Sequence, residues 1–279
     1  MESDLTWRGV EIDGWAALAL LEWQRELGAV EPMLDQPLDR MDLAPSIQST
    51  EPRSAPVASP TFQRESAPQA NAQSQLPDAA DVLASAQVLA DGAQNLELLA
   101  EAQAGFDGLA LKRGARNFVF ADGNPSARVM VIGEAPGVEE DAAGRPFVGR
   151  AGQLLDQMLK AIGLGRDLPD AGRAVYIANV LKWHPPGNRR PQPQEIALSL
   201  PFLHRQVELA DPDIVLLMGN TPCAAALNKE GILRLRGTWT EAFGRPALPM
   251  THPAYLLRNP IAKREAWADL LSLAARLEQ

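Results

Sequence analysis

Apolar residues in most of this chain form short continuous runs separated by amphipathic stretches. The continuous runs predict four buried strands, at residues 129–132, 175–181, 214–218 and a last one closing at 249–251. Helical spacing of apolar positions predicts helices at 79–103, 150–162, 195–209, 222–228 and 263–278. Strands that alternate with helices indicate an α/β fold with a central, mostly parallel four-stranded sheet. A strand-like run at 118–120 is followed by a predicted turn at 121–124.

The first 78 residues have a different pattern. Apolar positions at 13–30 have helical spacing, whereas 31–78 are rich in Pro, Gln and Ser and almost free of aromatic residues. Such a composition buries too little surface to offset the entropy lost on ordering. The pattern therefore predicts an N-terminal helical segment (1–30), a disordered linker (31–78) and one globular domain (79–279). The helix is either a packed accessory element or a peptide that recruits a partner protein.

Charge and cysteine content narrow the classes of protein. The net charge is -9, but residues 1–77 hold 5 basic and 12 acidic residues, against 21 and 23 in 78–279. The near-neutral remainder can therefore carry a local basic face. The single cysteine, Cys223, excludes an intrachain disulfide and a multi-thiolate metal site. No apolar run approaches the roughly 20 residues of a membrane span, and no signal peptide is expected at the start, so we expect a cytoplasmic protein.

Polar residues stand at the ends of three predicted strands. Glu134 lies in the turn at 133–137, where two glycines and a proline let the backbone approach a ligand closely. Asn179 and His252 end two further strands. Each has an ordinary structural explanation, as a turn cap, a satisfied buried amide or a loop histidine. Because open parallel sheets bind ligands beyond the carboxyl ends of their strands, the joint placement favours a site.

The residue types at this edge suit a planar, polar heterocycle. Phe147 can stack on it, and the Asn179 amide offers one donor and one acceptor to a base edge. A neutral His252 can donate to an oxygen that gains negative charge. Glu134 can orient water or stabilise a cationic sugar centre. The sequence has no G-x-S-x-G turn, Walker lysine or G-x-G-x-x-G fingerprint, and its three histidines lack metal-ligand spacing.

Two loops supply residues for nucleic-acid contact. Donors for phosphates are expected from Asn188, Arg189 and Arg190. Leu256 and Leu257, beside Arg258, can wedge into a base stack. Taken alone, the arginines are better explained as part of a solvated loop.

Three segments resemble the uracil-DNA glycosylase superfamily, most closely its family 4. They span 133–156, 176–193 and 251–270, and the resemblance covers most of 105–279. It implies a three-layer α/β/α sandwich that cuts the N-glycosidic bond of uracil in DNA. By this resemblance Glu134 and His252 are catalytic, Glu140 lies near uracil C5, where a thymine methyl would clash, and Ala135, Phe147 and Asn179 contact the base.

The chain departs from family 4 at its cofactor. The family carries four cysteines that bind a [4Fe–4S] cluster, and the matching positions here are Phe106, Leu109, Trp183 and Ser199. None supplies a thiolate. The resemblance therefore predicts no cluster and no other cofactor, with an apolar plug in its place.

The leading interpretation is a monomeric, monofunctional glycosylase whose substrate is uracil-containing DNA, single- or double-stranded. An alternative is a non-catalytic sensor of uracil or other deaminated bases that binds its product tightly or covalently. Covalent capture would involve a histidine such as His184, in the loop after Asn179. A third interpretation is an interaction protein whose N-terminal helix recruits a repair or replication protein; it is compatible with the other two.

Overall fold

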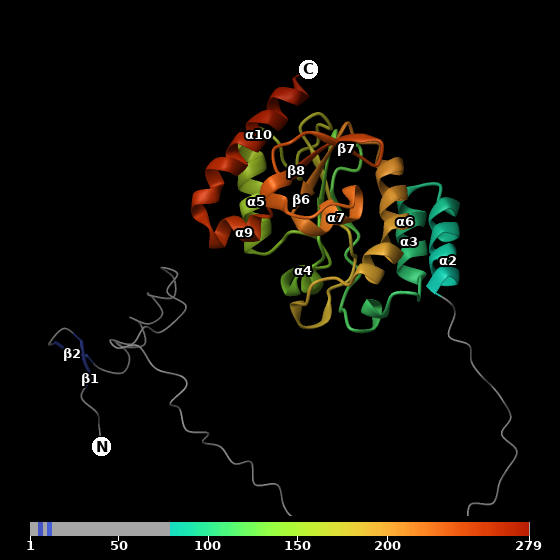
Figure 1. Ribbon diagram of the computed structural model, residues 1–279, viewed down its shortest axis with the longest axis horizontal. Helices are drawn as coiled ribbons and strands as arrows, with labels where there is room; N and C mark the ends of the chain where they lie inside the picture. Colours follow the sequence, from blue (N-terminus) through green and yellow to red (C-terminus); the bar gives the residue numbers. More distant parts are fainter. Residues whose placement is uncertain (1–4, 8–9, 13–78, 279) are drawn as a thin grey trace, which may run out of the picture. The chain divides into compact units, whose positions relative to one another are not determined.

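The computed structural model describes residues 5–7, 10–12 and 79–278 (Figure 1). β1 (Leu5–Trp7) and β2 (Val10–Ile12) pair as an antiparallel hairpin. The hairpin and the remaining described residues belong to separate units of the chain. The helix predicted at 13–30 and the linker predicted at 31–78 lie outside the described residues.

A six-stranded sheet forms the centre of the larger unit, in the order β3-β5-β4-β6-β8-β7. The four inner strands are mutually parallel, and the two edge strands, β3 and β7, are antiparallel to their neighbours. The strands are β3 (Ala121–Gly123), β4 (Val129–Gly133), β5 (Val175–Asn179), β6 (Ile214–Met218), β7 (Thr240–Ala242) and β8 (Arg245–Met250). The predicted four-stranded parallel sheet is therefore confirmed as the inner part of a larger mixed sheet.

The edge strands explain where the sequence pattern was wrong. β3 occupies 121–123, where we expected a turn, whereas 118–120 is not a strand. Phe118 instead packs against Trp183, with ring centroids 5.0 Å apart. β3 and β7 are three residues each, too short for a period-two pattern to reveal them.

Helices cover both faces of the sheet, which confirms the three-layer α/β/α architecture (Figure 1). α5 (Arg150–Ala161) and α10 (Lys263–Leu277) bury apolar side chains against one face. α6 (Pro193–Ala210) packs on the other face, with α2 (Ala79–Gly92) and α3 (Leu96–Gly105) packed on α6. The remaining helices are short: α4 (Val138–Ala143), α7 (Asn220–Leu227), α8 (Ile232–Leu235), α9 (Pro253–Arg258), η1 (Ala110–Arg113), η2 (Pro186–Asn188) and η3 (Pro260–Ala262).

The single helix predicted at 79–103 is two helices. α2 ends at Gly92, and Asn95 caps α3, its side-chain oxygen accepting a hydrogen bond from the Leu98 amide at 2.8 Å. An N-cap side chain satisfies an otherwise unpaired amide and so starts a new helix. The apolar periodicity continues across the break, which is why the pattern alone did not reveal it.

The parallel strands bring the predicted polar residues to one edge. Gly133 of β4 lies opposite Asn179 of β5, and Met218 of β6 lies opposite Met250 of β8. Glu134, which follows β4, and His252, which follows β8, therefore project from the same end of the sheet as Asn179. This is the edge where open parallel sheets bind their ligands.

Candidate active site

Glu134 is held in place by a residue that the sequence pattern did not indicate. The Thr221 hydroxyl donates a hydrogen bond to Glu134 Oε2, with an oxygen–oxygen distance of 2.5 Å. Thr221 lies in the first turn of α7, directly after β6, so the contact links the ends of two neighbouring strands. Its position in a polar turn after a buried strand was the only signal in the sequence.

A small polar cavity of about 150 Å³ opens beside Glu134. It lies between the turn after β4 and the loop after β5, which closes over it with His184 and Asn188. The His184 Nδ1 atom is 2.8 Å from the Pro136 carbonyl oxygen. Because a carbonyl only accepts, Nδ1 is the donor in this contact. The residues lining the cavity are Glu134, Ala135, Pro136, Gly137, His184, Pro185, Asn188 and Arg189.

Phe147, Asn179 and His252 form a second group next to this turn. The rings of Phe147 and His252 stack with centroids 5.5 Å apart and planes at 28°. Gly133 allows the approach, since a Cβ there would lie 2.3 Å from Asn179 Oδ1 and 2.5 Å from the Phe147 ring. Phe147 is 5 % exposed and Asn179 is 2 % exposed. The structure therefore brings together the aromatic, amide and imidazole groups that we predicted from the sequence.

His252 is held as a neutral hydrogen-bond donor. Its Nδ1 accepts a hydrogen bond from the Ala254 amide at 3.2 Å, at the start of α9, so the ring proton lies on Nε2. Burial, helped by the positive charge of Arg258 and opposed by Glu140, lowers the pKa of His252 to about 4. A neutral imidazole with an Nε2–H group suits an oxygen that becomes negative.

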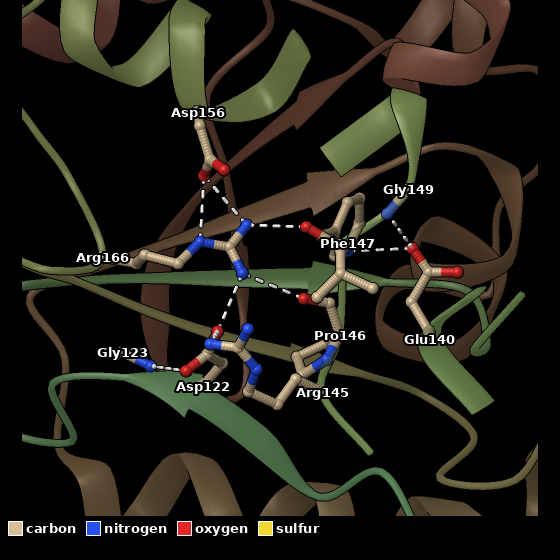
Figure 2. Close-up of polar contacts among 10 residues, drawn as sticks. Asp122, Gly123, Glu140, Arg145, Pro146, Phe147, Gly149, Asp156 and Arg166 are labelled. Atoms are coloured by element: carbon tan, nitrogen blue, oxygen red, sulfur yellow. Dashed lines mark hydrogen bonds and ion pairs between the residues drawn. The ribbon is translucent and has the colours of Figure 1, made fainter. Parts of the chain in front are cut away.

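Glu140 is bound to the backbone on both sides of the Phe147 loop. Its Oε1 accepts hydrogen bonds from the amides of Val148 and Gly149 at 3.0 and 2.9 Å, and its Oε2 accepts one from Gly137 at 3.1 Å. Figure 2 shows the carboxylate pointing at Gly149, the residue directly before α5. Glu140 therefore ties the turn after β4 to the segment that carries Phe147.

A buried lysine donates a hydrogen bond to the backbone carbonyl of Asn179. Lys182 is fully buried, and its Nζ donates to the Asn179 carbonyl oxygen at 2.8 Å and to Gln206 Oε1 at 2.6 Å. Burial lowers the pKa of Lys182 to about 7. Gln206 in turn donates to the Tyr176 hydroxyl at 2.9 Å. Lys182 directly follows the predicted strand at 175–181, and no pattern in the sequence indicated its burial.

The loop predicted to bind phosphates is partly committed to the protein itself. Arg189 forms a bidentate ion pair with Glu195, at 2.9 and 2.5 Å, which closes the loop onto the start of α6. Asn188 and Arg190 are exposed. Two of the three predicted side chains, Asn188 and Arg190, are therefore accessible from the surface. Arg189 is partly buried, and its guanidinium is paired with Glu195.

The predicted wedge needs a correction. Leu256 is 1 % exposed and packs against Ala262 and Ala266, so it belongs to the core and not to a surface that can enter DNA. A helix turns its successive residues to different sides, and α9 places Leu257, at 37 % exposure, and Arg258 outward. Of the two leucines, Leu257 is the one at the surface.

The positions that match the cluster cysteines do not fit an iron–sulfur cluster. Phe106, Leu109 and Trp183 are buried in one apolar group, in which Phe106 and Phe202 have ring centroids 5.4 Å apart. The Ser199 hydroxyl, also buried, has no hydrogen-bond partner within the described residues. A cluster of this kind requires thiolates, and none of these side chains supplies one.

Within the described residues, no three His, Cys, Asp or Glu side chains gather as metal ligands would. Of the helices described, none has the length and apolarity needed to cross a membrane.

Comparison with known proteins identifies the family. A sequence model of the uracil DNA glycosylase superfamily matches residues 120–271. A type-4 uracil-DNA glycosylase of Thermotoga maritima is 42% identical over 146 residues, which cover 51% of this chain and 73% of the relative. One from Sulfurisphaera tokodaii is 40% identical over 154 residues, covering 52% and 67%. One from Pyrobaculum aerophilum is 34% identical over 191 residues, covering 63% and 91%. This chain therefore belongs to the uracil DNA glycosylase superfamily.

Proposed function

We propose that this chain is a monofunctional uracil-DNA glycosylase of base-excision repair, which hydrolyses the N-glycosidic bond of uracil in DNA and leaves an abasic site. The observation that carries the proposal is the gathering of Phe147, Asn179 and His252 beside Glu134 at the carboxyl edge of the sheet. The relatives named type-4 uracil-DNA glycosylases support the same activity.

Recognition of the base uses the buried group. A flipped uracil stacks on Phe147, while the Asn179 amide pairs with the uracil O4 and N3–H groups. Ala135 lines the same turn, and Glu140 stands where a C5 methyl group would enter. Because Phe147 is only 5 % exposed, the base enters by local opening around the ring.

Cleavage breaks the C1′–N1 bond, and its electron pair leaves with the uracil. The Nε2–H group of His252 donates to uracil O2 as that oxygen becomes negative. The Glu134 carboxylate stabilises the cationic sugar and takes a proton from the water that adds to C1′. Thr221 occupies Glu134 Oε2, which leaves Oε1 for the water.

DNA is held on the same edge of the domain. Asn188 and Arg190, with the free part of Arg189, contact phosphates. Leu257 and Arg258 enter the groove beside the emptied base position. Flipping costs a few kcal/mol and least for mispaired bases, so uracil opposite guanine or in single strands is the preferred substrate.

The enzyme works without an iron–sulfur cluster, its place being taken by the apolar group around Phe106, Leu109 and Trp183. Protein purified without oxygen should show no visible charge-transfer absorption and no stoichiometric iron. A cluster spectrum with bound iron would contradict this part of the proposal.

An oligonucleotide assay tests the activity. The protein is incubated with DNA that contains one uracil, and hot alkali then reveals abasic sites as strand breaks. Wild-type protein should give breaks at uracil alone, and Glu134→Gln should lose about 100-fold or more in rate. Lys229→Gln is a matched control, because this exposed residue lies beyond the far end of α7. The absence of breaks with wild-type protein would reject the proposal.

One observation favours the product-binding alternative. His184 lines the cavity that holds Glu134, with its Nδ1 atom 2.8 Å from the Pro136 carbonyl oxygen, which places a histidine side chain beside the proposed site of cleavage. DNA that stays bound without alkali-sensitive sites would favour a sensor, and a shift of the DNA on a denaturing gel would favour covalent capture. The histidine variant His184→Ala should abolish that shift.

The glycosylase domain, 79–279, acts as a monomer. The N-terminal segment, 1–30, recruits a repair or replication protein to it, and the linker, 31–78, connects the two. Deleting residues 1–77 should then leave excision from naked oligonucleotide unchanged. A loss of excision in the truncated protein would assign the segment to the catalytic domain instead.

A further inference from the structure

The residue that stacks on the base has an unusual backbone. Phe147 adopts φ +53°, in the left-handed region that bulky residues rarely occupy. Such a conformation is strained in a bulky residue and persists only where the surroundings enforce it. Something in the structure must therefore hold the loop between α4 and α5 in this shape.

The side chain of Arg166 provides one half of that support (Figure 2). Its two terminal nitrogens donate separately to the carbonyl oxygens of Pro146 and Phe147, each at 2.9 Å. The side chain is 7 % exposed, and its charge is balanced by Asp122, at 2.9 Å, and by Asp156, at 2.8 Å. The guanidinium thus reaches strand β3, helix α5 and the Phe147 loop at once.

Glu140 provides the other half by binding the two amides that follow Phe147. The carbonyls up to Phe147 and the amides beyond it are therefore fixed from opposite sides. Gly152 completes the arrangement, because a Cβ at that position would lie 1.8 Å from the Phe147 carbonyl oxygen. The backbone at Phe147 therefore cannot change its conformation without breaking these contacts.

We infer that Arg166 is a positioning residue for uracil recognition: its hydrogen bonds to the Pro146 and Phe147 carbonyls fix the backbone that places the Phe147 ring where the base stacks. The inference rests on the proposed function and deepens it. Arg166 reaches the base only through Phe147, so its effect should fall on the affinity for uracil and on the choice of base.

The geometry requires arginine and not merely a positive charge. A guanidinium is a planar fork whose two terminal nitrogens donate in parallel. A lysine ammonium keeps the charge between Asp122 and Asp156 but is a single point on a flexible stem. Arg166→Lys should therefore preserve folding and lose the joint hold on both carbonyls.

The test is a double-mutant cycle with Phe147→Ala in the full chain. We expect Arg166→Lys to weaken inhibition of excision by free uracil about tenfold and to raise KM more than it lowers kcat. In the Phe147→Ala background the same change should have almost no effect, since the ring it positions is gone. Arg205→Gln is the matched control, because Arg205 also joins a backbone carbonyl, that of Ala93, to a carboxylate, Glu208.

The outcomes separate this inference from the proposed function. Additive losses in the double variant, or an equal loss of uracil affinity in Arg205→Gln, would assign Arg166 to general stability and overturn the inference alone. Wild-type protein that does not excise uracil would overturn the proposed function first. If Arg166→Lys does not fold, Asp122→Asn loosens the same clamp with the arginine retained, and the same non-additivity with Phe147→Ala is required.

Discussion

Two neighbouring regions of this protein meet along residues 179–183 and are built on opposite principles. On one side, the active-site edge is a polar network in which Asn179, Lys182 and Gln206 are joined by short hydrogen bonds. On the other side, Trp183 packs in an apolar group with Phe106 and Leu109. These three positions match cysteines of the family 4 enzymes that this chain resembles. Base recognition requires hydrogen-bonding atoms at fixed positions in the polar network. The apolar group has only to fill the space between elements, which apolar side chains can do.

The comparison predicts that truncating the apolar region damages stability far more than chemistry. Trp183→Ala should lower the free energy of unfolding by about 3–5 kcal/mol, because it leaves a cavity in a closely packed group. Denaturant unfolding measures this loss. Excision by the fraction still folded should stay within a few-fold of wild type. A stable variant with a 100-fold lower rate would show that the two regions are not separable.

The polar region should respond in the opposite way. His252→Ala should lower the excision rate about 10²–10³-fold, as expected for removal of a donor to a developing oxyanion. Because burial lowers the pKa of His252 to about 4, the imidazole stays neutral from pH 8 down to about 5, and the part of the rate that depends on His252 should be constant across that range. Single-turnover rates across this range measure it. A wild-type rate that falls near pH 6.5, and no such fall in the variant, would mean that His252 acts as an ordinary histidine.

Lys182 lies between the polar network and the apolar group, directly before Trp183 in the chain. Lys182→Met leaves two buried acceptors unpaired and should cost about 1–3 kcal/mol of stability at pH 9. Burial lowers the pKa of Lys182 to about 7, so from pH 7 to 10.5 the unfolded chain holds a proton that the folded one releases. Wild-type stability relative to the variant should therefore rise with pH across that window. A difference that is constant with pH would refute the shift.

Thr221 gives the smallest expected effect. Thr221→Val removes the donor to Glu134 without changing the shape of the side chain much, and should slow excision about tenfold, as the loss of one charge-assisted hydrogen bond. Thr221→Ser keeps the hydroxyl and should restore the rate. A wild-type rate for Thr221→Val together with a slowed Thr221→Ser would leave the packing of the methyl group, and not the hydrogen bond, as the function of this residue.

Much of the fold could be predicted because local pattern and global position agree in the inner strands. β4, β5 and β6 are continuous apolar runs because both of their faces are covered. The errors arose where tertiary contacts override local pattern. Phe118 packs on Trp183 and leaves the edge strand to start at Ala121, and Leu256 turns inward beneath α10 although its neighbour Leu257 faces out.

The sequence by itself determined the parallel α/β sheet and the set of polar residues at the ends of its strands. It did so because strand burial and the turn chemistry of glycine and proline act over a few residues. Only the tertiary structure decided how those residues are held. Thr221 meets Glu134 across 87 residues of chain, and Arg166 grips Phe147 across 19. Contacts of this kind depend on the packing of separate elements, and no local pattern encodes them.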